Sequence, residues 1–106
     1  MKLSKNSSKP IDLCPIVSTI SMIGSEPKLL IIRYLFEGPK RFNELQRTTR
    51  LSSKTLSKSL KELESLGIIE RKSNSVIKFY QLTEKGKELK GVFDELRKWG
   101  EKFANT

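Results

Sequence analysis

The segment SSKTLSKSLKELESLGIIERK, residues 52–72, gives the strongest indication of the fold. On a helical wheel at about 100° per residue, its first part gathers Leu56, Leu60 and Leu63 on one side. The opposite side carries cationic and hydroxyl groups, namely Lys54, Lys58, Lys61 and Ser65, with Thr55 and Ser57 beside them. A helix in the DNA major groove needs this division, because Lys contacts phosphates or guanine and hydroxyl groups bond to bases or phosphates.

The neighbouring segments place this helix in a motif. A short helix is expected over residues 42–48, and a turn over 49–51 leads to Ser52 or Ser53 as the N-cap of the basic helix. Gly67 suits its left-handed C-terminus. Residues 68–72 and 76–82 are strand-like, with 73–75 as the hairpin tip. The order predicts a mainly α fold with a small β-hairpin wing, a winged helix-turn-helix.

Three more helices complete the expected domain. The first covers residues 15–23 and ends at Gly24, and the second follows the cap Ser25 and holds the apolar run 29–36, so it should be the most buried. A last, continuous helix is expected over residues 84–103, capped by Thr83. Residues 1–10 should form a flexible basic arm, and residues 11–106 a single domain.

The charge of the chain is strongly basic and unevenly placed. Lys and Arg number 21 against 12 Asp and Glu, which favours a nucleic acid over a membrane surface as partner, although excess lysine can also serve solubility alone. Residues 40–61 hold seven basic side chains and one acid, Glu44, whereas residues 84–102 hold six basic and five acidic ones. The positive charge is therefore concentrated at the predicted groove-binding helix.

Composition excludes several function classes. With no His and one Cys, the chain lacks His-based acid–base catalysis, Ser-His-Asp or Cys-His systems and an ordinary intramolecular zinc site. It shows no phosphate-cradling glycine loop, so neither an enzyme nor a cofactor is expected. No apolar run approaches the ~18 residues of a membrane span and no signal-peptide pattern opens the chain, which favours a cytoplasmic protein, nucleoid-associated when bound to DNA.

The predicted DNA contacts come from the basic helix, the turn before it and the wing. The candidates are Arg41, Arg50, Ser52, Ser53, Lys54, Thr55, Ser57, Lys58, Lys61, Arg71, Lys72 and Lys78. A basic wing suits the backbone or the minor groove. The alternative for the helix is an ordinary solvated face, and for the wing an edge strand protected by charge.

An aromatic stripe on the last helix predicts a dimer interface. Together with the first helix it would supply residues Ile16, Ile20, Leu89, Val92, Phe93, Leu96, Trp99 and Phe103. A two-fold dimer would present two recognition helices ~34–36 Å apart, matching an inverted-repeat operator. The alternative is a last helix that packs only on its own domain.

The single cysteine, Cys14, precedes Pro15 at the expected start of the first helix. Free amide groups and the helix dipole at such a position favour a thiolate, which makes Cys14 a possible sensor. The competing interpretation is a small buried apolar residue, because cysteine is among the most buried residue types.

With these features in place, the chain resembles the HxlR-type family of winged-helix transcriptional regulators, relatives of the MarR group. The matching pieces are CPI at 14–16, IG at 23–24, LLII at 29–32, GPKRFNEL at 38–45, SSKTLSKSLKELESLGIIER at 52–71, YQLTEKGKEL at 80–89 and Trp99. Pro27 departs from the family, which commonly has Trp there. The resemblance implies a homodimeric cytoplasmic DNA-binding regulator, in which a cysteine at the place of Cys14 senses oxidants or electrophiles in some relatives.

The function predicted from these observations is sequence-specific binding of double-stranded DNA for transcriptional control, by a homodimer and with no membrane association. A redox or electrophile response through Cys14 is an added hypothesis. The alternatives are a winged-helix module that docks an acidic protein and a protein that coats chromatin without sequence preference.

Overall fold

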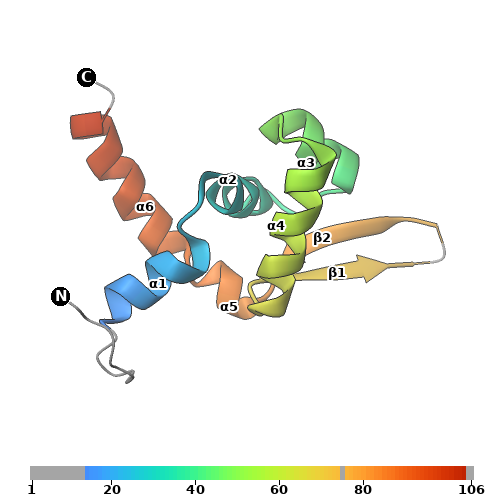
Figure 1. Cartoon of the computed structure of the whole chain (residues 1–106), viewed down its shortest axis with the longest axis horizontal. Helices are drawn as coiled ribbons and strands as arrows, with labels where there is room; N and C mark the ends of the chain where they lie inside the picture. Colours follow the sequence, from blue (N-terminus) through green and yellow to red (C-terminus); the bar gives the residue numbers. More distant parts are fainter. Residues whose placement is uncertain (1–13, 75, 105–106) are drawn as a thin grey trace.

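A computed structural model describes residues 14–74 and 76–104, and the expected basic arm at residues 1–10 lies outside them. The elements are α1 (Pro15–Ile23), α2 (Glu26–Leu35), α3 (Phe42–Thr49), α4 (Ser53–Ser65), β1 (Ile69–Ser73), β2 (Lys78–Leu82), α5 (Glu84–Lys87), α6 (Lys90–Trp99) and the π-helical segment η3 (Gly100–Ala104). The predicted mainly α fold with a β-hairpin wing is confirmed (Figure 1).

The core sits where α2 meets α4 and the base of the wing. α2 buries Ile31, Ile32 and Leu35, as expected for the most apolar helix. The predicted leucine stripe of α4 is confirmed, because Leu56, Leu60 and Leu63 are all buried. The other buried apolar residues are Ile23, Leu45, Ile68, Ile69 and Leu82. We call α2, α3, α4, β1 and β2 the helix-turn-helix unit, and α1, α6 and η3 the outer helices.

Local signals set the ends of the helices in this unit. Ser52 is the N-cap of α4, and its hydroxyl accepts a hydrogen bond from the Thr55 backbone N–H at 3.1 Å. Gly67 follows the helix with φ 76°, the left-handed conformation that the sequence predicts. At the start of α3, the Glu44 carboxylate accepts a hydrogen bond from the Arg41 backbone N–H at 2.8 Å.

The wing is a two-stranded antiparallel hairpin whose second strand is shorter than predicted. Ile69 pairs with Leu82, and an isolated bridge between Lys40 and Tyr80 ties the loop before α3 to β2. The second strand begins at Lys78 and not at residue 76, because the Asn74 side chain organises the tip. Its Oδ1 accepts hydrogen bonds from the backbone N–H groups of Val76 and Ile77, both at 2.8 Å.

The prediction of one continuous helix over residues 84–103 is wrong. The chain forms α5, turns at Glu88 and Leu89, continues as α6 and ends in the π-helical η3. Gly86 packs so closely on the Ile68 carbonyl that no Cβ would fit, which pins α5 against the start of β1. The Leu89 N–H then bonds to the Gly86 carbonyl three residues back, at 3.0 Å, and this tighter turn lets α6 leave the core.

Figure 1 shows the resulting shape. The wing extends to one side of α3 and α4, while α1 and α6 lie on the opposite side. Among the described residues no single helix is long and apolar enough to cross a membrane, although α1 and α2 would reach that length and composition together, with a bend of 86° between them.

Candidate nucleic-acid interface

The outward side of α4 is a cationic surface formed by exposed lysines. Lys54, Lys58 and Lys61 are exposed, opposite the buried leucines of the same helix. Within residues 14–74 and 76–104, none of these three ammonium groups forms an ion pair. Thr55 and Ser57 flank them and are half-buried. We call these three lysines the α4 lysine face; they are free to meet an external anion.

The turn before α4 is held in an unusual conformation. Arg50 has φ 62°, and among the described residues it is the one non-glycine position with a positive φ. A left-handed conformation costs free energy for a residue with a Cβ, and such outliers cluster at functional sites. The Arg50 side chain is exposed next to the N-terminus of α4.

The first residue of α4 is positioned by α3. The Gln46 side-chain amide donates a hydrogen bond to the Ser53 hydroxyl oxygen at 2.8 Å. Because the Ser53 oxygen acts as acceptor, its own hydrogen stays available for an acceptor outside the protein. The Ser52 hydroxyl oxygen also acts as an acceptor, from the Thr55 backbone N–H in the helix cap, so its hydrogen is available in the same way. Arg41 is exposed at the start of α3.

The positive groups around Glu44 also act on its ionisation. The hydrogen bond from the Arg41 backbone N–H lowers the pKa of the Glu44 carboxyl, and the charges of Arg41, Lys40 and Arg47 lower this pKa further. The carboxylate thus stays ionised and keeps the first turn of α3 capped.

The wing carries the remaining cationic candidates. Arg71, Lys72 and Lys78 are all exposed on the two strands, and Lys72 pairs loosely with Glu70, with 3.8 Å between Nζ and Oε1. The hairpin projects away from the body of the domain beyond α4 (Figure 1). The structure therefore presents two separate cationic elements, the α4 lysine face and the wing.

The outer helices expose a large apolar surface. Ile16 and Ile20 on α1, and Val92, Leu96, Trp99 and Phe103 on α6 and η3, are exposed, with Trp99 at 63%. The Trp99 and Phe103 rings stack at a tilt, 5.1 Å apart. Leu89 and Phe93 differ from the other predicted interface residues, because they are half-buried against their own core, where Phe93 meets Phe36 edge to face.

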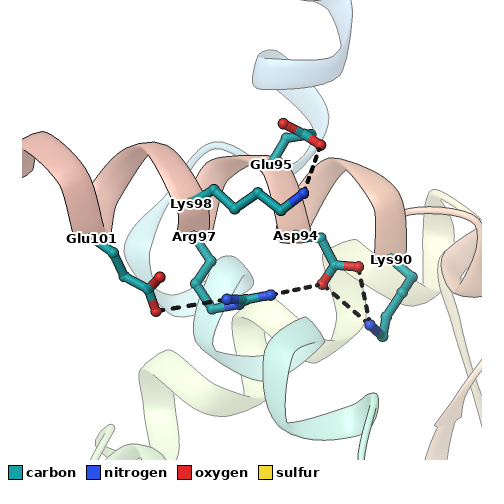
Figure 2. A network of polar contacts seen from close by, with 6 residues as sticks. All are labelled: Lys90, Asp94, Glu95, Arg97, Lys98 and Glu101. Carbon is teal, nitrogen blue, oxygen red and sulfur yellow. Dashed lines mark hydrogen bonds and ion pairs between the residues drawn. The ribbon is translucent and has the colours of Figure 1, made fainter.

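The charges of α6, unlike those of α4, are paired with one another. Figure 2 shows the Asp94 carboxylate between Lys90, at 3.1 Å, and Arg97, at 3.6 Å. Arg97 also reaches Glu101, and Lys98 reaches Glu95. The hydrogen bond from Lys90 lowers the pKa of Asp94, with a further contribution from Arg97.

Cys14 is exposed and is the N-cap of α1, directly before Pro15. The expected position at a helix N-terminus is confirmed, and burial as a small apolar residue is not what the structure shows. In the described part of the chain, no group of three or more His, Cys, Asp or Glu side chains could hold a metal ion.

Sequence reasoning missed two residues near the α4 lysine face. Ser59 is buried with 6% exposure, and Lys28 on α2 has a side chain only 15% exposed. Ser59 lies on the same side of α4 as the leucines. A hydroxyl at a position in the apolar stripe could therefore have identified it as a buried polar residue from the sequence. For Lys28 the sequence carries no such signal, because its burial depends on how α2 crosses α4.

Comparison with known proteins gives a consistent result. Residues 22–106 match the HxlR-like helix-turn-helix family. The HTH-type transcriptional regulator YodB of Bacillus subtilis is 42% identical over 97 residues, which cover 87% of each chain.

Two solved structures extend the likeness to the fold. The reduced form of YodB superposes with a TM-score of 0.76 at 38% identity, covering 88% of this chain and 96% of YodB. The redox regulator HypR in its reduced form superposes with a TM-score of 0.81 at 31% identity, covering 87% of this chain and 95% of HypR. These relatives are regulators and not enzymes. The chain therefore belongs to the HxlR-like helix-turn-helix family of transcriptional regulators.

Proposed function

We propose that the protein is a homodimeric, sequence-specific regulator that binds double-stranded DNA with α4 in the major groove. The observation that carries this proposal is the α4 lysine face. Its three exposed ammonium groups have no ion pair among the described residues, and the leucines on the opposite side of the helix anchor it in the core. Such a helix offers cations to phosphates and guanine while its orientation stays fixed. A protein of this kind would work in the cytoplasm, on the nucleoid.

The remaining contacts surround α4. Ser53 offers a hydroxyl hydrogen beside the lysines, and Arg41 and Arg50 reach the backbone from α3 and the turn. Arg71, Lys72 and Lys78 bring the wing to a neighbouring phosphate or the minor groove. The predicted positions Ser52, Thr55 and Ser57 belong to the same surface, with Ser52 acting chiefly as the cap that fixes the helix.

The outer helices form the dimer interface in this proposal. Six apolar side chains would leave water when a second copy covers them, namely Ile16, Ile20, Val92, Leu96, Trp99 and Phe103. Leu89 and Phe93 support this surface from within their own domain. Residues 11–106 then act as one domain whose two-fold partner places a second α4 one helical turn away on DNA, which fits an inverted repeat.

The decisive experiment is selection of bound duplexes from a random library. We expect enrichment of an inverted repeat, and an affinity for it that falls by ~10³–10⁵ between 50 and 200 mM salt if the dimer makes ~6–10 phosphate contacts. Tight binding without any enriched sequence would instead favour a chromatin-coating protein. Absence of any duplex preference at physiological salt would favour the protein-interaction module.

We further propose that Cys14 makes DNA binding responsive to electrophiles. The thiol is exposed at the N-terminus of α1, next to the apolar surface proposed for the dimer. Among the relatives, HypR is a redox regulator and YodB has been solved in a quinone-bound form. Addition of the Cys14 thiol to a quinone would form one S–C bond, break the S–H bond and one ring π bond, and leave the proton on a quinone oxygen. The product would place a hydroquinone group beside the interface.

This part of the proposal is tested on the single thiol. Treatment with a quinone should add one adduct mass per chain and change the operator affinity of the wild type, whereas Cys14→Ser should bind DNA normally and ignore the reagent. An adduct at Cys14 with unchanged oligomeric state and operator affinity would contradict sensing. It would leave the DNA-binding proposal intact.

A further inference from the structure

A groove of about 510 Å³ lies between the N-terminus of α2 and the middle of α4. Lys54 and Lys58 line one side of it, so the groove opens next to the α4 lysine face. We infer that this groove seats one backbone phosphate of the bound duplex, held by Ser59, Lys28 and the two α4 lysines. The inference rests on the proposed function and adds Ser59 and Lys28 to the DNA contacts.

The first observation is a buried hydroxyl that has no hydrogen-bond partner within the described part of the chain. Ser59 lines the groove and is only 6% exposed. Its hydroxyl forms no hydrogen bond to any residue in 14–74 or 76–104, although serine in a helix often bonds to the preceding turn. A buried polar group without a partner destabilises a protein, and such groups call for an explanation. A phosphate oxygen in the groove would accept the Ser59 hydrogen.

The second observation is the charge of the groove. Three ammonium groups, those of Lys28, Lys54 and Lys58, line it together with one carboxylate, that of Glu62. Glu62 is paired with Lys28, with 3.4 Å between Nζ and Oε1. Lys54 and Lys58 form no ion pair with any residue that the structure describes, so the lining keeps an excess of positive charge that suits an anionic phosphodiester.

Lys28 is held in place and does not move freely as a surface lysine would. Its Nζ donates a hydrogen bond to the Met22 carbonyl at 3.3 Å as well as pairing with Glu62. Ser25, which also lines the groove, caps α2 by accepting a hydrogen bond from the Lys28 backbone N–H. The N-terminus of α2, with its positive dipole end, thus faces the same space. Glu26, the acid of this first turn, is not part of the lining.

The geometry favours a duplex phosphate over a free ion. A helix in the major groove has a sugar–phosphate strand along each side, so groups on a helix packed beside it can lie near that strand. Here α2 packs against α4, and their shared groove is continuous with the side of α4 proposed to meet DNA. A phosphate flanking the major groove would reach Lys54 and Lys58 first and Ser59 behind them.

The inference is tested first with Ser59→Ala, measured on the duplex enriched by selection. Loss of a hydrogen bond to a charged phosphate should weaken binding by about tenfold or more. The melting temperature of the free protein should stay the same or rise, because the substitution removes a buried hydroxyl that has no partner. A merely structural serine would show the reverse, with lowered melting temperature and unchanged affinity.

A second test uses two acids of α4 as a matched pair. Glu62→Gln and Glu64→Gln each remove one negative charge, but only Glu62 lines the groove. Glu62→Gln should therefore tighten operator binding several-fold more than Glu64→Gln. Equal effects of the two substitutions would show general charge attraction and overturn a phosphate seat at this position.

A third test locates the phosphate itself. The test uses operator duplexes in which one phosphate at a time is replaced by an uncharged methylphosphonate. At one position the replacement should weaken binding of the wild type but hardly weaken binding of Ser59→Ala further, so that the two changes are not additive. If no position couples to Ser59 while the wild type still binds the operator, the inference fails and the proposed function stands. Inorganic phosphate that raises the melting temperature without such coupling would assign the groove to a free anion and also overturn it. Failure of the wild type to bind any duplex would remove both.

Discussion

The helix-turn-helix unit and the outer helices expose opposite kinds of side chains, cationic in the first and apolar in the second. In the helix-turn-helix unit the leucines of α4 are buried, while the α4 lysine face has no ion pair among the described residues. In the outer helices the cations of α6 are paired, while Trp99, Leu96 and Ile16 are exposed. On the proposal above, a polyanion would cover the first region and an apolar partner the second. The contrast supports the proposal that the chain has two different partners.

Matched leucine substitutions should show this contrast most strongly. Leu60→Ala, in the core of the helix-turn-helix unit, should lower the free energy of unfolding by about 2–5 kcal/mol at any protein concentration, because it leaves a cavity. Leu96→Ala, on an exposed side chain, should change the free energy of unfolding of the monomer by less than about 0.5 kcal/mol.

Urea denaturation at several protein concentrations measures both effects. If the outer helices form a dimer, the effect of Leu96→Ala should grow with protein concentration, as the dimer contributes to stability. If Leu96→Ala in dilute protein lowered the free energy of unfolding as much as Leu60→Ala does, Leu96 would belong to the core of its own chain. The contrast between the two regions would then be wrong.

The two sets of lysines should differ next. Replacing Lys54, Lys58 and Lys61 together by Ala should weaken operator binding by about a hundredfold at low salt. It should also flatten the dependence of log K on log salt by about 0.9 for each phosphate that the variant no longer neutralises. The melting temperature should hardly change, because these side chains are exposed.

The control for this variant removes the same charge from paired lysines. Lys87, Lys90 and Lys98 each bond to a nearby acid, and their replacement by Ala should affect operator binding far less. Similar reductions in affinity for the two triple variants, by fluorescence anisotropy, would mean that net charge and not the α4 lysine face governs binding.

Arg50 allows a smaller test within the helix-turn-helix unit. Arg50→Gly should raise the free energy of unfolding by about 1 kcal/mol, because glycine adopts the left-handed φ of 62° without strain. The same change should weaken operator binding through loss of the guanidinium. Arg50→Asn, which tolerates this conformation but is neutral, should bind DNA as poorly as the glycine variant; normal binding by either would exclude Arg50 from the interface.

The smallest effects concern one acid in each region. The pKa of Glu44 and that of Asp94 are both lowered by a hydrogen bond to the ionised carboxylate. Ionised Glu44 therefore stabilises the fold above its ordinary value of 4.5, and this contribution is lost as the pH falls through the lowered folded-state pKa. Ionised Asp94 likewise stabilises the fold above its ordinary value of 3.8, and this contribution is lost as the pH falls through its lowered folded-state pKa.

Thermal unfolding between pH 2 and 7 checks these signs. Glu44→Gln and Asp94→Asn should each lower the melting temperature near neutral pH, and the difference from wild type should vanish in acid. Glu44→Gln should have the larger effect, because its carboxylate also caps α3. A difference that grows as the pH falls would contradict the assigned cause of either shift.

The sequence predicts the helix-turn-helix unit well because its signals are local. The stripe of Leu56, Leu60 and Leu63 lies within one helix, and the cap Ser52 and the end Gly67 depend on their immediate neighbours. The α4 lysine face follows from the same periodicity. These features need no knowledge of which element packs where.

Apart from the start of β2, which local hydrogen bonds of Asn74 set, the misses depend on contacts between distant segments. The break after α5 arises because Gly86 meets the Ile68 carbonyl, and the groove at Ser59 exists because α2 crosses α4. The division of the aromatic stripe, with Phe93 on the core and Trp99 exposed, follows from the direction that α6 takes after the break. Periodicity marks both aromatic residues as apolar-facing but cannot say which surface each one meets.

The turn at Glu88 and Leu89 separates α5, which is fixed to the wing base, from α6 and η3, which extend about 20 Å beyond it. A rotation of about 10° at this turn would carry the far end of η3 by about 4 Å. In a two-fold pair joined through α6 and η3, a chemical change near the turn or at Cys14 that caused such a rotation would alter the distance between the two recognition helices. That distance must match the spacing between the two half-sites of an operator.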